Sequence, residues 1–186
     1  MTISEVPAGG FQAYADIPIA FTVRSILLAR TVEGGLGGLL LTEMPVAPYQ
    51  KDYDALESPL AWAACFDTSR WAVFAAHEDG RRIGGAVAAW NTPDVDMLEG
   101  RTGLAVLWDI RVHPDFRRRG AGHALFQAAA QWARERGCTA MDVETQNVNV
   151  PACRFYARQG CDLRIIRRFA YPTLPHEVQL IWRLRL

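Results

Sequence analysis

Apolar runs separated by polar turns dominate the middle of the chain. Residues 72–77 and 83–90 are mostly apolar, and the polar turn between them contains Asp79 and Gly80. Asp-Gly favours a tight hairpin because glycine tolerates a positive φ, so this stretch predicts an antiparallel hairpin. A polar connection, 91–103, leads to the next apolar run, Leu104–Val112, which predicts a further strand.

Helical spacing of apolar residues appears after that strand. In 121–136 the apolar positions recur at helical intervals, and Gly137 follows where a helix C-terminus favours glycine. A shorter helix is expected at 150–159, stopped by Gly160. Three more strands are expected, at 139–145, 162–170 and 177–184.

The N-terminal third carries weaker patterns. Residues 19–29 alternate loosely and predict an opening strand. The glycine-rich 34–38 predicts a turn or mobile loop, and the absence of a following Lys-Ser/Thr argues against a phosphate loop. Residues 53–66 predict one or two short helices, interrupted by Pro59.

The order of these elements predicts an α/β fold of the α+β type. We expect a mixed, mostly antiparallel central sheet of about seven strands with helices on both faces. A chain of 186 residues, half of them hydrophobic, suits one well-buried core. We therefore expect a single domain over 1–186.

Charge and cysteine usage narrow the class of protein. Twenty basic and 20 acidic residues cancel, so no overall field favours nucleic acid or a membrane surface. The N-terminal residues lack the basic and apolar regions of a secretory signal. The four cysteines have no Cys-x-x-Cys spacing and predict reduced core thiols and a cytoplasmic location: Cys65, Cys138, Cys153 and Cys161. The scattered histidines show no metal-binding spacing, so no metal is expected.

The strongest functional signal is the stretch Arg117-Arg118-Arg119-Gly120-Ala121-Gly122, which opens the 121–136 helix. Glycines allow close approach of the backbone, and a helix N-terminus offers unpaired N–H groups to an anion. The stretch therefore predicts a pyrophosphate cradle, with a solvated charge run as the plainer alternative. A dinucleotide-binding fold is disfavoured because seven residues separate strand from glycines and the third glycine of its motif is missing.

These residues resemble the acetyl-CoA loop of the GNAT superfamily of N-acetyltransferases. The Arg-x-x-Gly-x-Gly pattern follows a strand, and Glu144, Asn149, Tyr156 and Gly160 come downstream in the family's order. Several short segments further resemble the streptothricin acetyltransferase branch: Ala47-Pro48-Tyr49, Glu144-Thr145-Gln146, Ala152-Cys153, Phe155-Tyr156 and Ile181-Trp182. The resemblance implies the GNAT fold, with a splayed strand-helix-strand cofactor site inside 104–161.

The resemblance also implies which residues would hold acetyl-CoA. The pyrophosphate would lie on the loop and the first helical turn, while the backbone of the preceding strand would pair with pantetheine as an added strand does. Asn149 is the family's second cofactor contact. The expected cofactor residues are Ile110, Arg111, Val112, Arg117, Arg118, Arg119, Gly120, Ala121, Gly122, His123, Asn149 and Tyr156.

Acyl transfer to an amine also needs a base for the amine and an acid for the leaving thiolate. The resemblance assigns the acid to Tyr156, which shares a helical face with Cys153; a core tyrosine is the plainer alternative. Glu144 lies twelve residues before Tyr156, the spacing at which some relatives place the base. Asp109 on the preceding strand is the rival, and either acid alternatively faces solvent or holds an arginine.

The resemblance thus implies an acetyl-CoA-dependent N-acetyltransferase that acts on a primary amine of a small molecule, with streptothricin or a related antibiotic as the leading acceptor. Two departures from the streptothricin acetyltransferase branch weaken the prediction of streptothricin as the acceptor. Residues 54–69 contain few acidic residues that could attract a cation. Arginines occur at 164, 167 and 168, where they either bind a carboxylate of the acceptor or face solvent. The alternatives are a protein N-terminal or lysine acetyltransferase and a non-catalytic acyl-CoA sensor. Homodimer formation is left open.

Overall fold

The computed structural model describes residues 1–7 and 11–186, which fall into two compact units. Unit 1 comprises Met1–Ala20, Asp52–Val143 and Arg185–Leu186, and unit 2 comprises Phe21–Lys51 and Glu144–Leu184. The strands are β1 (Thr2–Val6), β2 (Phe21–Thr31), β3 (Leu39–Lys51), β4 (Ala72–Glu78), β5 (Arg81–Trp90), β6 (Leu104–Val112), β7 (Ala140–Gln146), β8 (Asp162–Arg167) and β9 (Gln179–Arg185). The α-helices are α1 (Phe11–Ala15), α2 (Trp62–Cys65), α3 (Ala121–Glu135) and α4 (Val150–Arg158).

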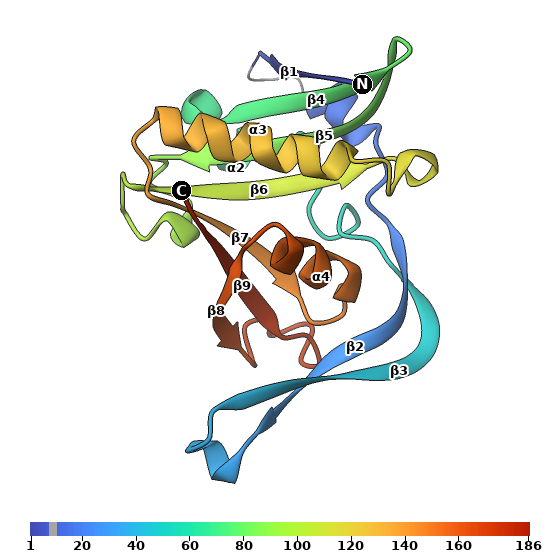
Figure 1. Cartoon of the computed structure of the whole chain (residues 1–186), viewed down its shortest axis with the longest axis vertical. Helices are drawn as coiled ribbons and strands as arrows, with labels where there is room; N and C mark the ends of the chain where they lie inside the picture. Colours follow the sequence, from blue (N-terminus) through green and yellow to red (C-terminus); the bar gives the residue numbers. More distant parts are fainter. Residues whose placement is uncertain (8–10) are drawn as a thin grey trace. The chain divides into compact units, whose positions relative to one another are not determined.

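The expected mixed sheet is confirmed. Its seven strands run in the order β1-β4-β5-β6-β7-β9-β8, and β2 and β3 form a separate two-stranded sheet. The pairings of β1 with β4, β4 with β5, β5 with β6 and β8 with β9 are antiparallel, whereas β6 pairs with β7 in parallel. In unit 1, α3 lies along β4, β5 and β6 (Figure 1).

The helix α3 begins and ends on glycines, as its sequence predicts. Gly120 occupies the N-cap with a φ of 90°, and Gly137 follows the C-terminus with a φ of 73°. Its apolar face is fully buried, including Leu125 and Phe126. Burying two such side chains stabilises the unit by about 3–6 kcal/mol, so the helix is held in place at its N-terminal turns.

The opposite face of the unit 1 sheet is covered by an aromatic cluster. Tyr14 of α1 and Trp62 of α2 are buried, and their ring centroids lie 5.9 Å apart. A Cβ atom added to Gly85 of β5 would lie 2.7 Å from the Tyr14 ring. The absence of a side chain at Gly85 therefore lets Tyr14 pack directly on the strand.

A bulge in β6 sets the orientation of the residues that follow it. Val87 pairs with Asp109 and Ala88 pairs with Leu107, so Trp108 is an extra residue. Because Val87 belongs to the aromatic-side core, its partner Asp109 faces the same side. The bulge therefore directs Asp109 towards Tyr14.

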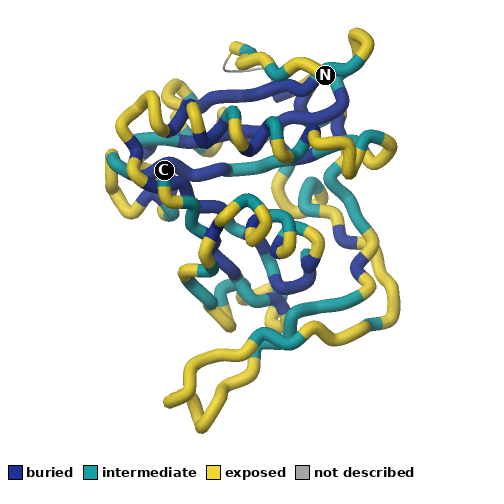
Figure 2. Tube along the Cα trace, viewed as in Figure 1, coloured by how far each residue is buried: buried dark blue, intermediate teal, exposed yellow. Residues whose placement is uncertain are grey.

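Unit 2 contains the β2–β3 hairpin, α4 and the β8–β9 pair. The hairpin tip is solvent-exposed (Figure 2), including Leu36 and Leu40. Asn147, just after β7, is buried. Its backbone and its side chain both form hydrogen bonds with Leu27 of β2 and with Val178. Its amide Nδ2 donates to the Leu27 carbonyl at 3.0 Å, and its Oδ1 accepts from the Val178 N–H at 2.8 Å. This one side chain therefore joins β2 to the segment before β9.

Three observed elements carry no clear signal in the sequence and were not predicted: β1, α1 and β3. The strand β1 is a short edge strand without an apolar run, and β3 contains Pro45 and Pro48, residues that count against a strand. The prediction that all four cysteines are core thiols is wrong for Cys65, which is exposed. Asp142, two positions before Glu144 on β7, is buried.

Candidate active site

The loop before α3 has the backbone geometry of an anion cradle. Arg118 and Gly120 both have positive φ, 62° and 90°, so the chain turns sharply into the helix. The N-cap glycine supplies no side chain to the first helical turn, and the Ala124 N–H is the one that bonds back to the Gly120 carbonyl, at 3.0 Å. A helix start without a side-chain cap presents N–H groups and a partial positive charge to a ligand. These residues fit the diphosphate of acetyl-CoA.

The three arginines of the loop are not equivalent. The Arg117 Nε donates to the Val112 carbonyl at 3.0 Å, and burial lowers the pKa of Arg117. Arg119 lies 3.5 Å from the Glu78 carboxylate and over the Phe116 ring. Arg117 therefore ties the loop back to the end of β6, while Arg119 is oriented by surface contacts that contribute little energy.

The strand β6 has an edge on which pantetheine would fit. Its register with β7 covers only the four pairs from Leu104–Ala140 to Leu107–Val143. The His113 N–H donates to the Ile83 carbonyl of β5, and backbone groups alternate in direction along a strand. The N–H and C=O of Ile110 and Val112 therefore point to the edge away from β5. Arg117 occupies the Val112 carbonyl, which leaves Ile110 as the better position for a pantetheine amide.

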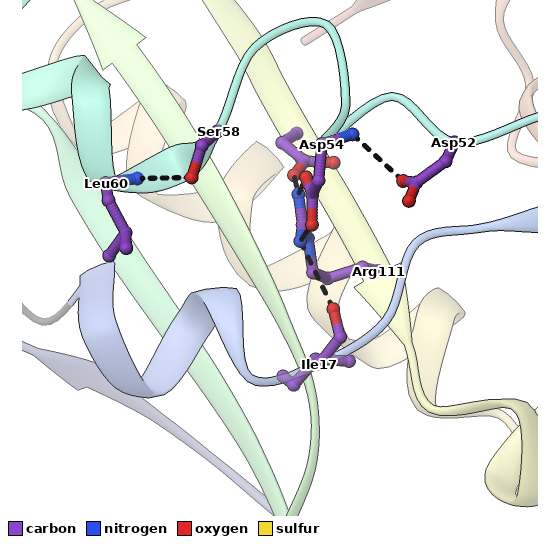
Figure 3. A network of polar contacts seen from close by, with 7 residues as sticks. Ile17, Asp52, Asp54, Ser58, Leu60 and Arg111 are labelled. Carbon is purple, nitrogen blue, oxygen red and sulfur yellow. Dashed lines mark hydrogen bonds and ion pairs between the residues drawn. The ribbon is translucent and has the colours of Figure 1, made fainter.

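Arg111 serves a different purpose from its neighbours on β6, because its side chain is the centre of a buried ionic cluster (Figure 3). The guanidinium donates to both Asp54 oxygens, at 2.9 and 3.0 Å, and to the Ile17 carbonyl at 3.2 Å. It also donates to Asp109 Oδ2, with its Nε at 2.9 Å. Arg111 thus joins three segments of unit 1 that are far apart in sequence.

Asp109, the rival base, is enclosed by this cluster. Burial raises its pKa, Arg111 opposes that rise, and Asp54 adds to it. Burial also raises the pKa of Tyr14 well above its usual range, with the Asp109 charge as the next cause. The Arg111 guanidinium lies 4.8 Å from the Tyr14 ring centroid. Of the two roles considered for Asp109, holding an arginine is the one seen in this structure.

Glu144, in unit 2, has neutral partners instead. Its Oε1 accepts from the Tyr171 hydroxyl at 2.5 Å and from Gln146 Nε2 at 3.2 Å, and its Oε2 accepts from Gln179 Nε2 at 2.8 Å. Glu144 and Gln146 share a face of β7, because side chains two positions apart in a strand point to the same side. The carboxylate is partly exposed and carries no arginine or lysine partner among these contacts.

Asn149, Cys153 and Tyr156 lie on α4 in the expected order. Asn149 is the N-cap, and its Oδ1 accepts from the Ala152 N–H at 3.2 Å. Cys153 and Tyr156 are both buried, and burial raises the pKa of the Cys153 thiol to about 12. The capping bond gives Asn149 a structural role, whatever it contributes to a cofactor.

Sequence reasoning did not single out three residues in these clusters. Asp54 lies 57 positions from Arg111, and Tyr171 lies 27 positions from Glu144, so neither has a local signal. Gln179 is a polar residue that opens the apolar strand β9, and that placement is a signal which could have been used.

Over residues 1–7 and 11–186, no group of three His, Cys, Asp or Glu side chains could hold a metal ion.

No helix in the described part of the chain is long and apolar enough to cross a bilayer.

The three arginines of the 162–170 stretch are exposed: Arg164, Arg167 and Arg168. Arg167 donates to Gln179 Oε1 at 3.1 Å, and Arg168 lies over the Phe169 ring.

Known proteins are similar to this chain in sequence and in fold. Streptothricin acetyltransferase of Escherichia coli is 31% identical over 148 residues, 78% of this chain and 75% of that protein. Streptothricin acetyltransferase A of Bacillus subtilis is 34% identical over 82 residues, and this match spans 47% of that relative's length.

Solved structures agree. Nourseothricin acetyltransferase has a TM-score of 0.78 at 25% identity, covering 99% of this chain and 97% of that one. A Bacillus anthracis protein assigned as a streptothricin acetyltransferase, in complex with acetyl coenzyme A, has a TM-score of 0.79 at 26% identity, covering 100% and 99%. The family model for the Acetyltransferase (GNAT) family matches residues 39–161. The chain therefore belongs to the GNAT family and is an acetyl-CoA-dependent N-acetyltransferase.

Proposed function

We propose that this enzyme acetylates a primary amine of a small molecule, with streptothricin or a related antibiotic as the leading acceptor. The observation that carries the proposal is the match with the E. coli streptothricin acetyltransferase over 78% of the chain. The acetyl-CoA-bound relative, which this chain matches over its whole length, supports the same cosubstrate.

The cofactor residues are proposed from the geometry of unit 1. The first turn of α3 and Gly120 would hold the diphosphate, and the outward-facing backbone of Ile110 would pair with pantetheine. Arg117 braces the loop against Val112. Arg111 contributes only its backbone, since its side chain is committed to the ionic cluster.

The chemical step is direct transfer without a covalent enzyme intermediate. The neutral acceptor nitrogen attacks the thioester carbonyl carbon, the new N–C bond forms, and the C–S bond breaks. Glu144 accepts the proton that the nitrogen loses, through a water molecule, and Tyr156 donates its proton to the departing thiolate. Solvent then restores both groups. The products are the N-acetylated amine and coenzyme A.

Protein acetylation is the second candidate. The ribosomal protein bS18-alanine N-acetyltransferase of Salmonella typhimurium is 36% identical over 81 residues, 43% of this chain. That match is shorter than the one to the E. coli streptothricin enzyme, so a protein N-terminus ranks below a small amine as acceptor. A non-catalytic acyl-CoA sensor is the third candidate, and buried Tyr156 is the feature in its favour.

Release of free coenzyme A distinguishes these functions. The purified enzyme is given acetyl-CoA with streptothricin, with simple primary amines, or with a peptide that begins with alanine. Turnover with streptothricin supports the proposal, turnover with the peptide alone moves the acceptor to protein, and binding without release supports the sensor.

The acid role of Tyr156 is tested in the same assay. Tyr156→Phe should lower kcat by about 100-fold while acetyl-CoA still binds. Tyr49→Phe is the matched control, because Tyr49 is a half-exposed tyrosine of the same unit. Unchanged turnover in the Tyr156 variant would remove the phenol from the mechanism.

The cellular location is proposed from the cysteines. None of the four is in a disulfide, and three are buried. Reduced thiols of this kind suit the cytoplasm.

A further inference from the structure

The proposed base is held by three side chains from three different segments of unit 2. Gln146 belongs to β7, Gln179 to β9, and Tyr171 to the connection between β8 and β9. All three donate to the Glu144 carboxylate, at 3.2, 2.8 and 2.5 Å. Donors converging from separate segments fix the orientation of the carboxylate as well as its position.

The three bonds fill the two oxygens unequally. A carboxylate oxygen has two acceptor directions. Both directions of Oε1 are taken, by the Tyr171 hydroxyl and Gln146 Nε2, whereas Gln179 takes one direction of Oε2. None of these three donors takes the second direction of Oε2, where a water molecule or an amine proton would bind.

Tyr171 has the shortest of the three contacts to Glu144. The Tyr171 O–H donates to the carboxylate at 2.5 Å in a charge-assisted hydrogen bond, as do the two amide donors beside it. The Tyr171 oxygen also accepts from Gln146 Nε2 at 2.8 Å, which closes a ring of Tyr171, Gln146 and Glu144. The hydroxyl proton is thereby directed at Oε1.

The backbone around Tyr171 keeps this side chain in place. The Tyr171 carbonyl accepts from the Leu174 N–H at 3.0 Å, and the Leu174 carbonyl accepts from the Glu177 N–H at 2.9 Å. Glu177 in turn accepts from Lys51 in a buried ion pair at 2.5 Å. The connection is thus tied to β3 by a charged contact and turns back on itself at Tyr171.

We propose that Tyr171 is a positioning residue that fills Oε1 of Glu144, so that Oε2 is the oxygen that receives the proton of the acceptor amine. This role rests on the proposed function, because it requires Glu144 to be the base. Tyr171 itself exchanges no proton with the acceptor.

Kinetics on a double-mutant cycle test the catalytic part. Tyr171→Phe removes only the hydroxyl and should lower kcat about tenfold, with the KM for acetyl-CoA unchanged. On the Glu144→Gln background, the same substitution should change kcat by less than about twofold. Tyr49→Phe is the control and should leave kcat unchanged on both backgrounds. An equal loss on both backgrounds, or a rise in the KM for the acceptor with kcat intact, would overturn the positioning role.

A spectroscopic signature tests the contact without any turnover. The tyrosine doublet in ultraviolet resonance Raman spectra reports whether a phenol acts mainly as a hydrogen-bond donor. The difference between wild type and Tyr171→Phe isolates the Tyr171 signal in the resting enzyme. A strong-donor intensity ratio that weakens in Glu144→Gln supports the contact, and a ratio unaffected by Glu144→Gln refutes it.

The two readouts separate the two proposals. If no amine or peptide releases coenzyme A, the proposed function fails, and the positioning role fails with it because it needs a reaction to serve; the Raman result then describes a structural bond alone. If turnover occurs while the cycle shows no coupling, the function stands and the positioning role is wrong.

Discussion

The two acids considered as bases lie in contrasting surroundings. Asp109, in unit 1, is bonded to a buried guanidinium that also holds Asp54. Within the described part of the chain, Glu144 of unit 2 is bonded to neutral donors, from Tyr171, Gln146 and Gln179. Burial raises the pKa of Asp109 and Arg111 opposes that rise, and removing the Arg111 charge breaks the cluster. A carboxylate held by neutral donors can accept a proton without stranding a buried cation. We therefore propose that Asp109 serves the structure and that Glu144 is the base.

The largest expected effect is on the stability of the Asp109 side of this comparison. Arg111→Met leaves Asp109 and Asp54 without their cation, and Arg111 is almost completely buried. Removing one partner of such a cluster should lower the free energy of unfolding by about 3–5 kcal/mol, measured by urea denaturation.

Arg101→Met is the matched control, because Arg101 forms an exposed ion pair with Glu99 at 3.5 Å. It should change the free energy of unfolding by less than about 0.5 kcal/mol. A cluster variant that unfolds at the wild-type urea concentration would show that Arg111 is not a structural centre.

The next effect is on turnover and concerns the Glu144 side. Glu144→Gln should lower kcat by about 100-fold with little change in the melting temperature. Asp109→Asn should keep most of the turnover of the folded enzyme, because its carboxylate serves the cluster. Asp162→Asn, at an exposed position that opens β8, is the control.

The comparison would be reversed if Asp109→Asn lost turnover and Glu144→Gln kept it. Asp109 would then be the base, and the ring around Glu144 would be structural. The rates are measured per folded enzyme, by coenzyme A release, so that a loss of stability does not count as a loss of catalysis.

The smallest effect is a change in how stability depends on pH. Burial raises the pKa of Asp109 above its value in the unfolded chain. Between these two pKa values the folded state binds more protons than the unfolded state, so this group lowers stability as the pH rises through that window. The window begins at about pH 4, the ordinary value for aspartate.

Asp109→Asn should therefore remove a decline in stability from pH 4 upwards. The measurement is the free energy of unfolding across a pH series for wild type and variant, and only the slopes are compared. Parallel slopes for the two proteins would mean that the carboxyl titrates alike in the folded and unfolded chain.

Elements with strong local signals were predictable from the residues alone. The 72–90 hairpin, the strand Leu104–Val112 and the helix after Gly120 each carry their own periodicity and glycine punctuation, and the structure contains all of them. The glycines and arginines of the loop before α3 were likewise visible, because a sharp turn into a helix requires particular residue types at adjacent positions.

Contacts that join distant segments became visible only in the folded chain. Pairing with β4 makes β1 a strand, pairing with β2 makes β3 a strand despite its two prolines, and the bulge at Trp108 turns Asp109 towards Arg111 and Asp54. Tyr171 reaches Glu144 across 27 positions. These pairings follow from chain topology and burial, which act on residues that are neighbours in space and leave no mark on the residues beside them in sequence.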